Sequence, residues 1–252
     1  MADLMDAVRR DRGLLRYVRP VWHALLRFRL PVFRPLYQTI WTFGPVADRV
    51  WTLVAKILYR EPMLRTRCAA VGRGVYLEGA LPQLFGNGRI SIGENVRIGS
   101  RNTWLVGCKV SDGAELVIGD RVHVNYQTTI SVAKRVHIGD DTLIAGNVQI
   151  YDNISHPLSP ERRLRHDAFT LEESSPVVIG KNCWIGNQAI IMRGVTIGDN
   201  SIVAAGAIVT KSVPPNVLVA GNPARVIKSI EDQPAGRLVV ETQPLTLAPA
   251  RA

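Results

Sequence analysis

A large aliphatic residue recurs at every sixth position through the middle of the chain. The series, which is interrupted briefly before Ile138 and at length before Ile179, is Ile118, Val124, Ile130, Ile138, Ile144, Ile150, Ile179, Ile185, Ile191, Ile197, Val203 and Val209. The residue four positions further on is usually small or β-branched, as in Val122, Thr128 and Cys183. An amphipathic helix needs a spacing near 3.6 and a simple strand alternates, so neither fits. The pattern favours a solenoid of short parallel strands, with the large residue pointing inward and three strands to each coil of about 18 residues.

The pattern is looser before residue 108. Val71 and Leu77 fit the spacing, and so do Ile92, Ile98 and Trp104, with an insertion expected over residues 81–88. These irregular first coils would cap the open end of the solenoid and protect its strand edges. We expect about five full coils, counting the group that begins at Ile92 as the first.

Residues 151–178 break the period altogether. They contain three prolines, several charges and two of the five histidines, His156 and His166. A long excursion from so regular a scaffold is more often a functional loop than a defect. We therefore expect a protruding loop at about 151–178.

The N-terminal region, residues 1–67, has a different character. Large apolar residues, including Trp22, Trp41 and Trp51, occur there at roughly helical spacing with arginines between them. Amphipathic helices are expected, broken near Pro31 and Pro35 and again near Gly44 and Pro45. They would either lie in a membrane interface or pack on the solenoid or a neighbouring subunit.

Charge is distributed unevenly over the 252 residues. The net charge is +10, and residues 1–67 carry 13 Lys and Arg against 5 Asp and Glu. The basic character therefore belongs to the N-terminal region, and no nucleic-acid partner is expected. The three cysteines lack the spacing of metal ligands or of a disulfide framework, which favours a cytoplasmic setting. Any membrane contact through residues 1–67 would be peripheral, on the inner face. The domains expected are a basic helical arm at 1–67, a solenoid at 68–228 and a flexible tail at 229–252.

The repeats resemble those of the hexapeptide-repeat acyltransferases, and residues 125–227 are similar to the galactoside and maltose O-acetyltransferase branch. The resemblance implies a mainly β fold, a left-handed parallel β-helix, which spacing alone could not reveal because crossovers are usually right-handed. It also implies a homotrimer, acetyl-CoA as co-substrate and no metal.

The resemblance assigns the catalytic role to His156, in the segment Tyr-Asp-Asn-Ile-Ser-His-Pro at 151–157. Histidine suits a general base because its ordinary pKa lies near neutrality. Asn125 matches an asparagine that hydrogen-bonds near the acceptor hydroxyl and the histidine of an adjacent subunit; it could equally be a corner residue. Asp152 could orient His156 or be a solvated turn residue. Ala133 stands where that branch has a sugar-binding carboxylate, which puts a simple-sugar acceptor in doubt.

Coenzyme A binding is assigned by the same resemblance. Trp184 matches an aromatic residue beside the catalytic groove, and an outward tryptophan would contribute little to the core. The remaining candidates are Gly186, Ala205 and Gly206 for the pantetheine and Lys211 and Arg225 for the phosphates. Small residues allow close approach, and cationic side chains suit phosphate.

These features predict an acetyl-CoA-dependent O-acetyltransferase in which His156 deprotonates a sugar hydroxyl of a surface polysaccharide or lipid-linked glycan. Two alternatives keep the chemistry and change the acceptor, namely a xenobiotic or a serine-type acetyltransferase. A zinc hydratase resembling carbonic anhydrase would need three converging imidazoles, and the spacing of His123, His137 and His156 does not match. A non-catalytic scaffold is the last alternative.

Overall fold

The computed structural model describes residues 27–28, 33–108 and 113–230. Contacts divide the chain into two units, Met1–Trp51 and Thr52–Ala252. Trp22, Pro31 and the tail from residue 231 onward lie outside the described residues, so the predictions made for them remain predictions.

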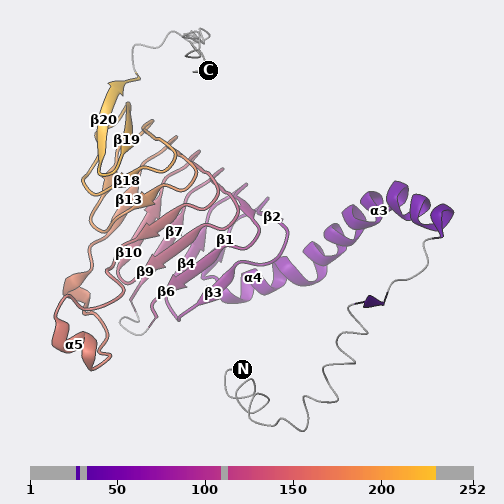
Figure 1. The fold of residues 1–252 in the computed structure, drawn as a ribbon, viewed down its shortest axis with the longest axis horizontal. Helices are drawn as coiled ribbons and strands as arrows, with labels where there is room; N and C mark the ends of the chain where they lie inside the picture. The colour runs from indigo at the N-terminus through magenta and orange to yellow at the C-terminus, as the bar shows by residue number, and fades with distance from the viewer. Residues whose placement is uncertain (1–26, 29–32, 109–112, 231–252) are drawn as a thin grey trace, which may run out of the picture. The chain divides into compact units, whose positions relative to one another are not determined.

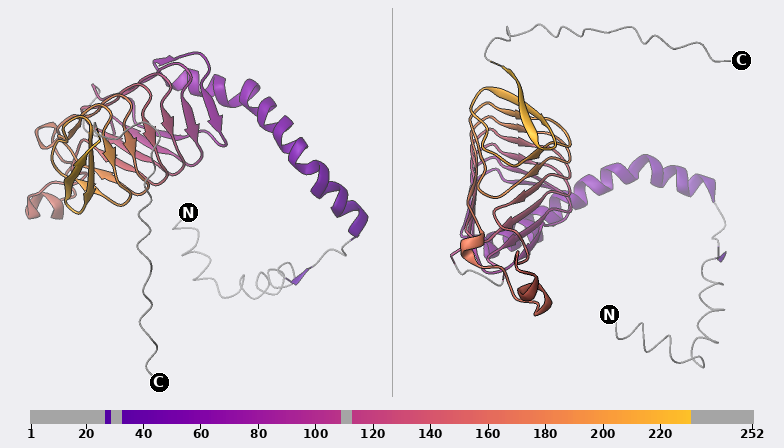
Figure 2. Two further views of the ribbon diagram at one scale, coloured as in Figure 1. Left: turned by 90° about the horizontal axis from the view of Figure 1, so that it is seen from above. Right: turned by 60° about the vertical axis from the view of Figure 1, so that its left-hand side comes forward.

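Three parallel sheets form the sides of a β-helix, and each coil contributes one strand to each sheet (Figure 1, Figure 2). Sheet A contains β1 (Ala70–Val71), β4 (Arg89–Ile92), β7 (Glu115–Ile118), β10 (Arg135–Ile138), β13 (Val177–Ile179) and β16 (Thr196–Ile197). Sheet B contains β2 (Tyr76–Glu78), β5 (Arg97–Gly99), β8 (His123–Val124), β11 (Leu143–Ile144), β14 (Trp184–Ile185), β17 (Ile202–Val203), β19 (Val217–Gly221) and β20 (Ala224–Ser229). Sheet C contains β3 (Gln83–Phe85), β6 (Thr103–Val106), β9 (Thr129–Val132), β12 (Gln149–Tyr151), β15 (Ile190–Ile191) and β18 (Ile208–Val209).

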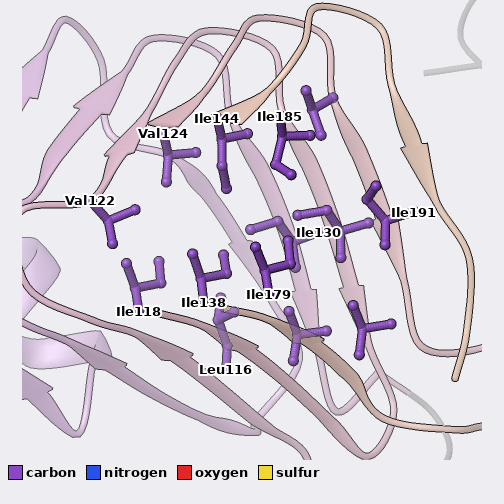
Figure 3. Packing of buried hydrophobic residues seen from close by; sticks show 14 of the residues in the cluster. Leu116, Ile118, Val122, Val124, Ile130, Ile138, Ile144, Ile179, Ile185 and Ile191 are labelled. Carbon is purple, nitrogen blue, oxygen red and sulfur yellow. The ribbon is translucent and has the colours of Figure 1, made fainter. Parts of the chain in front are cut away.

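The six-residue series forms the core, as predicted. All twelve large residues of the series are at most 2% exposed, and they stack in register from coil to coil. Figure 3 shows side chains from the three sides, among them Ile118, Val124 and Ile130, converging on one interior. Burying one such side chain contributes roughly 1.5–3 kcal/mol, so a strict repeat accumulates a large stabilisation.

The first coil is more complete than the sequence indicated. Residues 81–88 are not an insertion, because they contain β3, whose Leu84 pairs with Trp104 of the next coil. A seven-residue step from Leu77 to Leu84 hid this strand from a six-residue search. The described residues therefore form six coils, and the five counted from Ile92 follow this first one.

The C-terminal end of the β-helix is a hairpin. Strand β19 adds a parallel rung to sheet B beside β17, and β20 then runs back antiparallel to β19. The β-helix therefore ends in one rung, which covers the edge of β17 in sheet B, and its returning strand.

Residues in the left-handed backbone region make the corners between sides. Asn182, Asn200 and Asn216 have φ values of 51°, 61° and 59°, which asparagine tolerates better than most residues. Their side chains also form a ladder, with amide-to-amide hydrogen bonds of 2.9 Å and 2.8 Å. The corners thus add polar cross-links between coils that the aliphatic core cannot supply.

Helices precede the first coil. They are α3 (Arg34–Ala55), the short π-helix η1 (Lys56–Arg60) and α4 (Glu61–Arg67). The break predicted near Gly44 and Pro45 is wrong, because α3 continues through both residues. Proline removes one helical hydrogen bond, and in a helix without buried residues water can solvate the carbonyl released. None of the described helices is long and apolar enough to cross a membrane.

Helix α4 packs against the first coil. Leu64 is 1% exposed and belongs to the same apolar cluster as the repeat residues. Arg65 donates to the carbonyl of Val71, and Arg67 donates to the carbonyls of Gly86 and Gly88. This helix therefore covers core residues that the first coil would otherwise leave open.

Candidate active site

His156 lies at the base of the protruding loop, on the edge where sheet C passes into sheet A. The loop leaves the coils after β12 and returns at β13, and it carries α5 (Pro160–Leu164) and the short 3₁₀ helix η2 (Leu171–Glu173) (Figure 1). The His156 side chain is exposed, and among the described residues it has no hydrogen-bond partner. It is therefore accessible to a reacting group.

A pocket of about 260 Å³ opens beside His156. Its lining residues are Leu105, Cys108, Ser131, Val132, Asn153, Ser155, His156, His166, Asp167, Ala168 and Phe169. The lining combines apolar side chains, among them Leu105, Val132 and Phe169, with the two imidazoles. An apolar pocket with a few convergent polar groups is the usual form of a small-molecule site.

The backbone leading to His156 is fixed by Asp152. This carboxylate is fully buried and accepts hydrogen bonds from the N–H groups of Ala133, Lys134 and Arg135 at 2.7, 2.7 and 2.8 Å. Burial raises the pKa of the Asp152 carboxyl, and these hydrogen bonds oppose the rise. Asp152 is thus neither a solvated turn residue nor a partner of His156; it ties the loop base to the turn between β9 and β10.

Asn153 continues this anchor toward His156. Its amide nitrogen donates to the carbonyl and hydroxyl of Ser131 at 3.2 and 3.0 Å, and its amide oxygen accepts from the Ser155 N–H at 3.1 Å. Ser155 itself has a φ of 61°. A buried network therefore sets the direction in which the chain presents His156, as a preorganised catalytic group requires.

The loop is braced by its own side chains. Arg162 pairs with Glu173 at 3.2 Å, and the Glu173 carboxylate also accepts from the Thr170 N–H at 2.7 Å. The Ser175 N–H donates to the carbonyl of Asp152 at 2.8 Å and closes the loop at its base. The N–H of His166 donates to the carbonyl of Arg163 at 3.0 Å, and His166 lines the same pocket as His156.

Most of the other candidate residues lie on a different part of the β-helix. Asn125 follows β8 at the edge from sheet B to sheet C, and Gly186, Ala205 and Gly206 occupy the same edge in later coils. Trp184 is 54% exposed on the outer face of sheet B, paired with Leu143 and Ile202 of adjacent strands. Arg225 is exposed on β20 of sheet B. Lys211, by contrast, is exposed at the edge after sheet C, as is His156.

The candidates thus form two groups within one chain. His156 and Lys211 are on the edge between sheets C and A, and the rest are on sheet B or its edge with sheet C. One chain alone does not bring His156 together with Asn125 or Trp184. A groove between the first edge of one protomer and sheet B of another would do so.

The oxygen and the nitrogen of the Asn125 side-chain amide have different surroundings. Its amide oxygen accepts a hydrogen bond of 2.8 Å from the N–H of Tyr126, which supports the corner. Among the described residues its amide nitrogen has no partner, so that donor remains available. The corner role and the binding role are therefore compatible.

Glycine is required at positions 186 and 206 for different structural reasons. A Cβ on Gly186 would lie 2.5 Å from the Ala205 backbone nitrogen of the next coil, so Gly186 permits close stacking of the coils. Gly206 has open space around it and a φ of 70°, a backbone conformation that favours glycine. Space for a ligand therefore exists at Gly206 and the exposed Ala205, whereas at Gly186 the next coil occupies it.

Sequence reasoning missed several residues of this site. Leu105 and Cys108 reach the pocket from β6 and the segment directly after it, and Phe169 reaches it from the protruding loop, so no repeat spacing connects them. Asp152 carried one usable signal, because an acidic residue directly after a repeat strand must either leave the core or bind backbone donors.

Comparison with known proteins agrees with this architecture. The family model described as the hexapeptide repeat of succinyl-transferase matches residues 176–211. The galactoside O-acetyltransferase of Escherichia coli is 45% identical over 123 residues, which are 49% of this chain and 58% of that protein. A putative lipopolysaccharide biosynthesis O-acetyltransferase of Escherichia coli is 37% identical over 150 residues, 56% of this chain and 72% of that protein.

A solved structure shares the fold. A mutant of an N-acyltransferase from Bacillus cereus, in complex with dTDP and coenzyme A, aligns with a TM-score of 0.54 at 22% identity, covering 68% of this chain and 89% of that one. Together, the left-handed parallel β-helix and these relatives show that the chain belongs to the hexapeptide-repeat acyltransferases, in the galactoside and maltose O-acetyltransferase branch. The chain nevertheless spans only 56% to 59% of the length of several curated relatives it matches.

Proposed function

We propose that the protein is an acetyl-CoA-dependent O-acetyltransferase that modifies a sugar hydroxyl in surface polysaccharide or lipid-linked glycan biosynthesis. The supporting observation is His156, an exposed imidazole on a rigid loop base beside a pocket of about 260 Å³. The family membership supplies the reaction class, and the position of His156 supplies the general base.

The reaction proceeds by direct attack. The acceptor hydroxyl oxygen bonds to the thioester carbonyl carbon while its proton passes to a ring nitrogen of His156. The tetrahedral intermediate then collapses, the carbon–sulfur bond breaks, and the coenzyme A thiolate takes the proton from the imidazolium. No covalent acyl-enzyme is needed. Cys108 and Ser155 line the pocket, yet neither has a basic partner among the described contacts that would activate it.

The active site is shared between protomers of a homotrimer. The two groups of candidates lie on different sides of one chain, so a complete site needs His156 from one protomer and Asn125 from the next. Sheet B also presents an apolar column suited to burial, in which Leu143 is 50% exposed and Trp184 54% exposed, followed by Ile202. The amide N–H of Asn125 that has no partner among the described residues would then donate to the hydroxyl oxygen of the sugar that receives the acetyl group.

Acetyl-CoA lies along the groove between protomers. The exposed Ala205 and Gly206 leave room for the pantetheine, and Trp184 covers it. Lys211 and Arg225 bind its phosphates, since both are exposed and cationic.

The acceptor is larger or less polar than a simple galactoside. Ala133, at the position of the expected carboxylate, is buried and its N–H is bound to Asp152, so it offers no group to a sugar. The pocket wall formed by Leu105, Val132 and Phe169 suits an apolar part of the acceptor. The basic residues 1–67 would hold the enzyme at a membrane where lipid-linked acceptors are made.

A single substitution tests the chemistry. His156→Ala should lower the rate of coenzyme A thiol release with acceptor by at least ~100-fold, the effect of losing a general base. His137→Gln is a matched control, because His137 lies on sheet A away from the pocket. Undiminished acetylation by the His156 variant, with its oligomeric state intact, refutes the assignment.

An acceptor screen tests the substrate class. Glycan and lipid-linked sugar acceptors should support thiol release, whereas serine and aminoglycoside-type or phenicol-type antibiotics should not. Turnover confined to serine or an antibiotic would favour the alternatives of the same fold.

A further inference from the structure

Helix α3 carries a large apolar surface that is open to the solvent. None of its residues is buried. Trp41 is 86% exposed, Trp51 65% and Phe43 63%. Exposed apolar area of this extent on one element marks an interaction surface.

The apolar residues of α3 follow the helical period. The central row is Leu36, Ile40, Phe43, Ala47, Val50 and Val54, which alternates steps of four and three residues. Tyr37, Val46, Trp51 and Leu53 flank this row and widen the face. A stripe for pairing two helices is narrow, whereas this face covers roughly half the helix circumference.

The opposite side of α3 is polar and carries its charges. It contains Arg34, Gln38, Thr42, Asp48, Arg49 and Thr52, with Trp41 and Pro45 among them. The surrounding region is strongly basic, with 13 Lys and Arg against 5 Asp and Glu in residues 1–67. The long-range attraction of this region is therefore toward an anionic surface, and a second copy, equally basic, would be repelled.

We propose that α3 lies in the interface plane of an anionic phospholipid bilayer. The row from Leu36 to Val54 enters the acyl boundary, and Trp51, at the margin of this face, sits at the depth of the headgroups. Arg34 and Arg49, on the opposite side of the helix, add to the positive charge that attracts the anionic surface. The contact is in-plane because the apolar row occupies one side of α3 and the charges the other. The proposal concerns binding and is independent of acetyl transfer.

Vesicle binding by the full chain tests the proposal. The probe is vesicles of phosphatidylglycerol and phosphatidylcholine, with pure phosphatidylcholine vesicles as the comparison. The variant Phe43→Gln with Val50→Gln removes apolar side chains from the centre of the face. The matched control, Thr42→Gln with Thr52→Gln, places the same residue on the polar side of the same helix without changing charge.

The two variants should separate clearly. We expect the Phe43 and Val50 variant to lose at least about tenfold in partition to the anionic vesicles, while the control binds as the parent does. Neither set of side chains is buried, so the thermal unfolding of the β-helix should be unchanged in both. Binding that is absent in the parent, or that falls equally in both variants, overturns the proposal. A smaller oligomer in the Phe43 and Val50 variant, without vesicle binding by the parent, would show instead that α3 packs on other copies.

Discussion

The Asp152 carboxylate accepts the N–H of Lys134 at 2.7 Å, and this hydrogen bond fixes the loop that carries the candidate base to the coil beneath it. The N–H groups of Ala133 and Arg135 donate to the same carboxylate, so Asp152 accepts hydrogen bonds from three successive residues of the backbone. The geometry of the candidate site therefore depends on a residue that does not line the pocket.

Replacing Asp152 with Asn should destabilise the protein. The amide NH₂ would face backbone donors, leaving at least one buried N–H without an acceptor, at a cost of about 1–3 kcal/mol. Chemical unfolding measures this change. Asp141→Asn is the control, because its ion pair with Arg121 is exposed and should contribute little to stability. Equal stability of the Asp152 variant and the parent would contradict the anchoring role.

Replacing Gly186 with Ala should also destabilise the β-helix. The added Cβ would meet the Ala205 nitrogen at 2.5 Å, and the coils must separate locally to admit it. Such overpacking costs typically about 1–3 kcal/mol. Gly44→Ala is the control, because nothing lies within 4 Å of the corresponding Cβ on α3. A melting temperature equal to that of the parent would show that the stacking is looser than the structure indicates.

Mixing two inactive variants tests the shared site. His156→Ala and Asn125→Ala remove groups from different sides of the chain. In random mixed trimers about a quarter of the sites would combine an intact His156 with an intact Asn125, so activity should reappear after co-expression. Steady-state thiol release measures it. Activity of the mixture no higher than that of the separate variants would mean that each chain forms its own site.

Cysteine labelling should report pocket occupancy. Cys68 and Cys183 are buried, and burial raises the pKa of the Cys68 thiol to about 11, so both should resist alkylation at neutral pH. Cys108 is partly exposed and lines the pocket with His156. Mass spectrometry of briefly alkylated native protein should therefore find Cys108 modified first, and a bound acceptor should slow it. Preferential labelling of Cys68 would contradict the packing of the first coil.

Structural features that repeat periodically along the chain could be predicted from the sequence, whereas features that depart from the period could not. The inward positions, such as Ile130 and Ile150, could be predicted because every coil repeats the same environment and selects the same residue type. Strand β3 was missed because one extra residue breaks the period while the strand still pairs. The helix break at Pro45 was predicted from local propensity, and the uninterrupted α3 shows that one lost hydrogen bond did not end the helix.

The sequence by itself determined the coil, its core and the position of His156 at the base of a loop. Only the tertiary structure decided that Cys108, His166 and Phe169 share a pocket with His156, and that Asp152 binds a turn of the preceding coil. The physical reason is that repeat spacing is a local property of the chain. The pocket and the buried carboxylate depend instead on contacts between segments far apart in sequence, which form when the coils stack and the loop folds back on them.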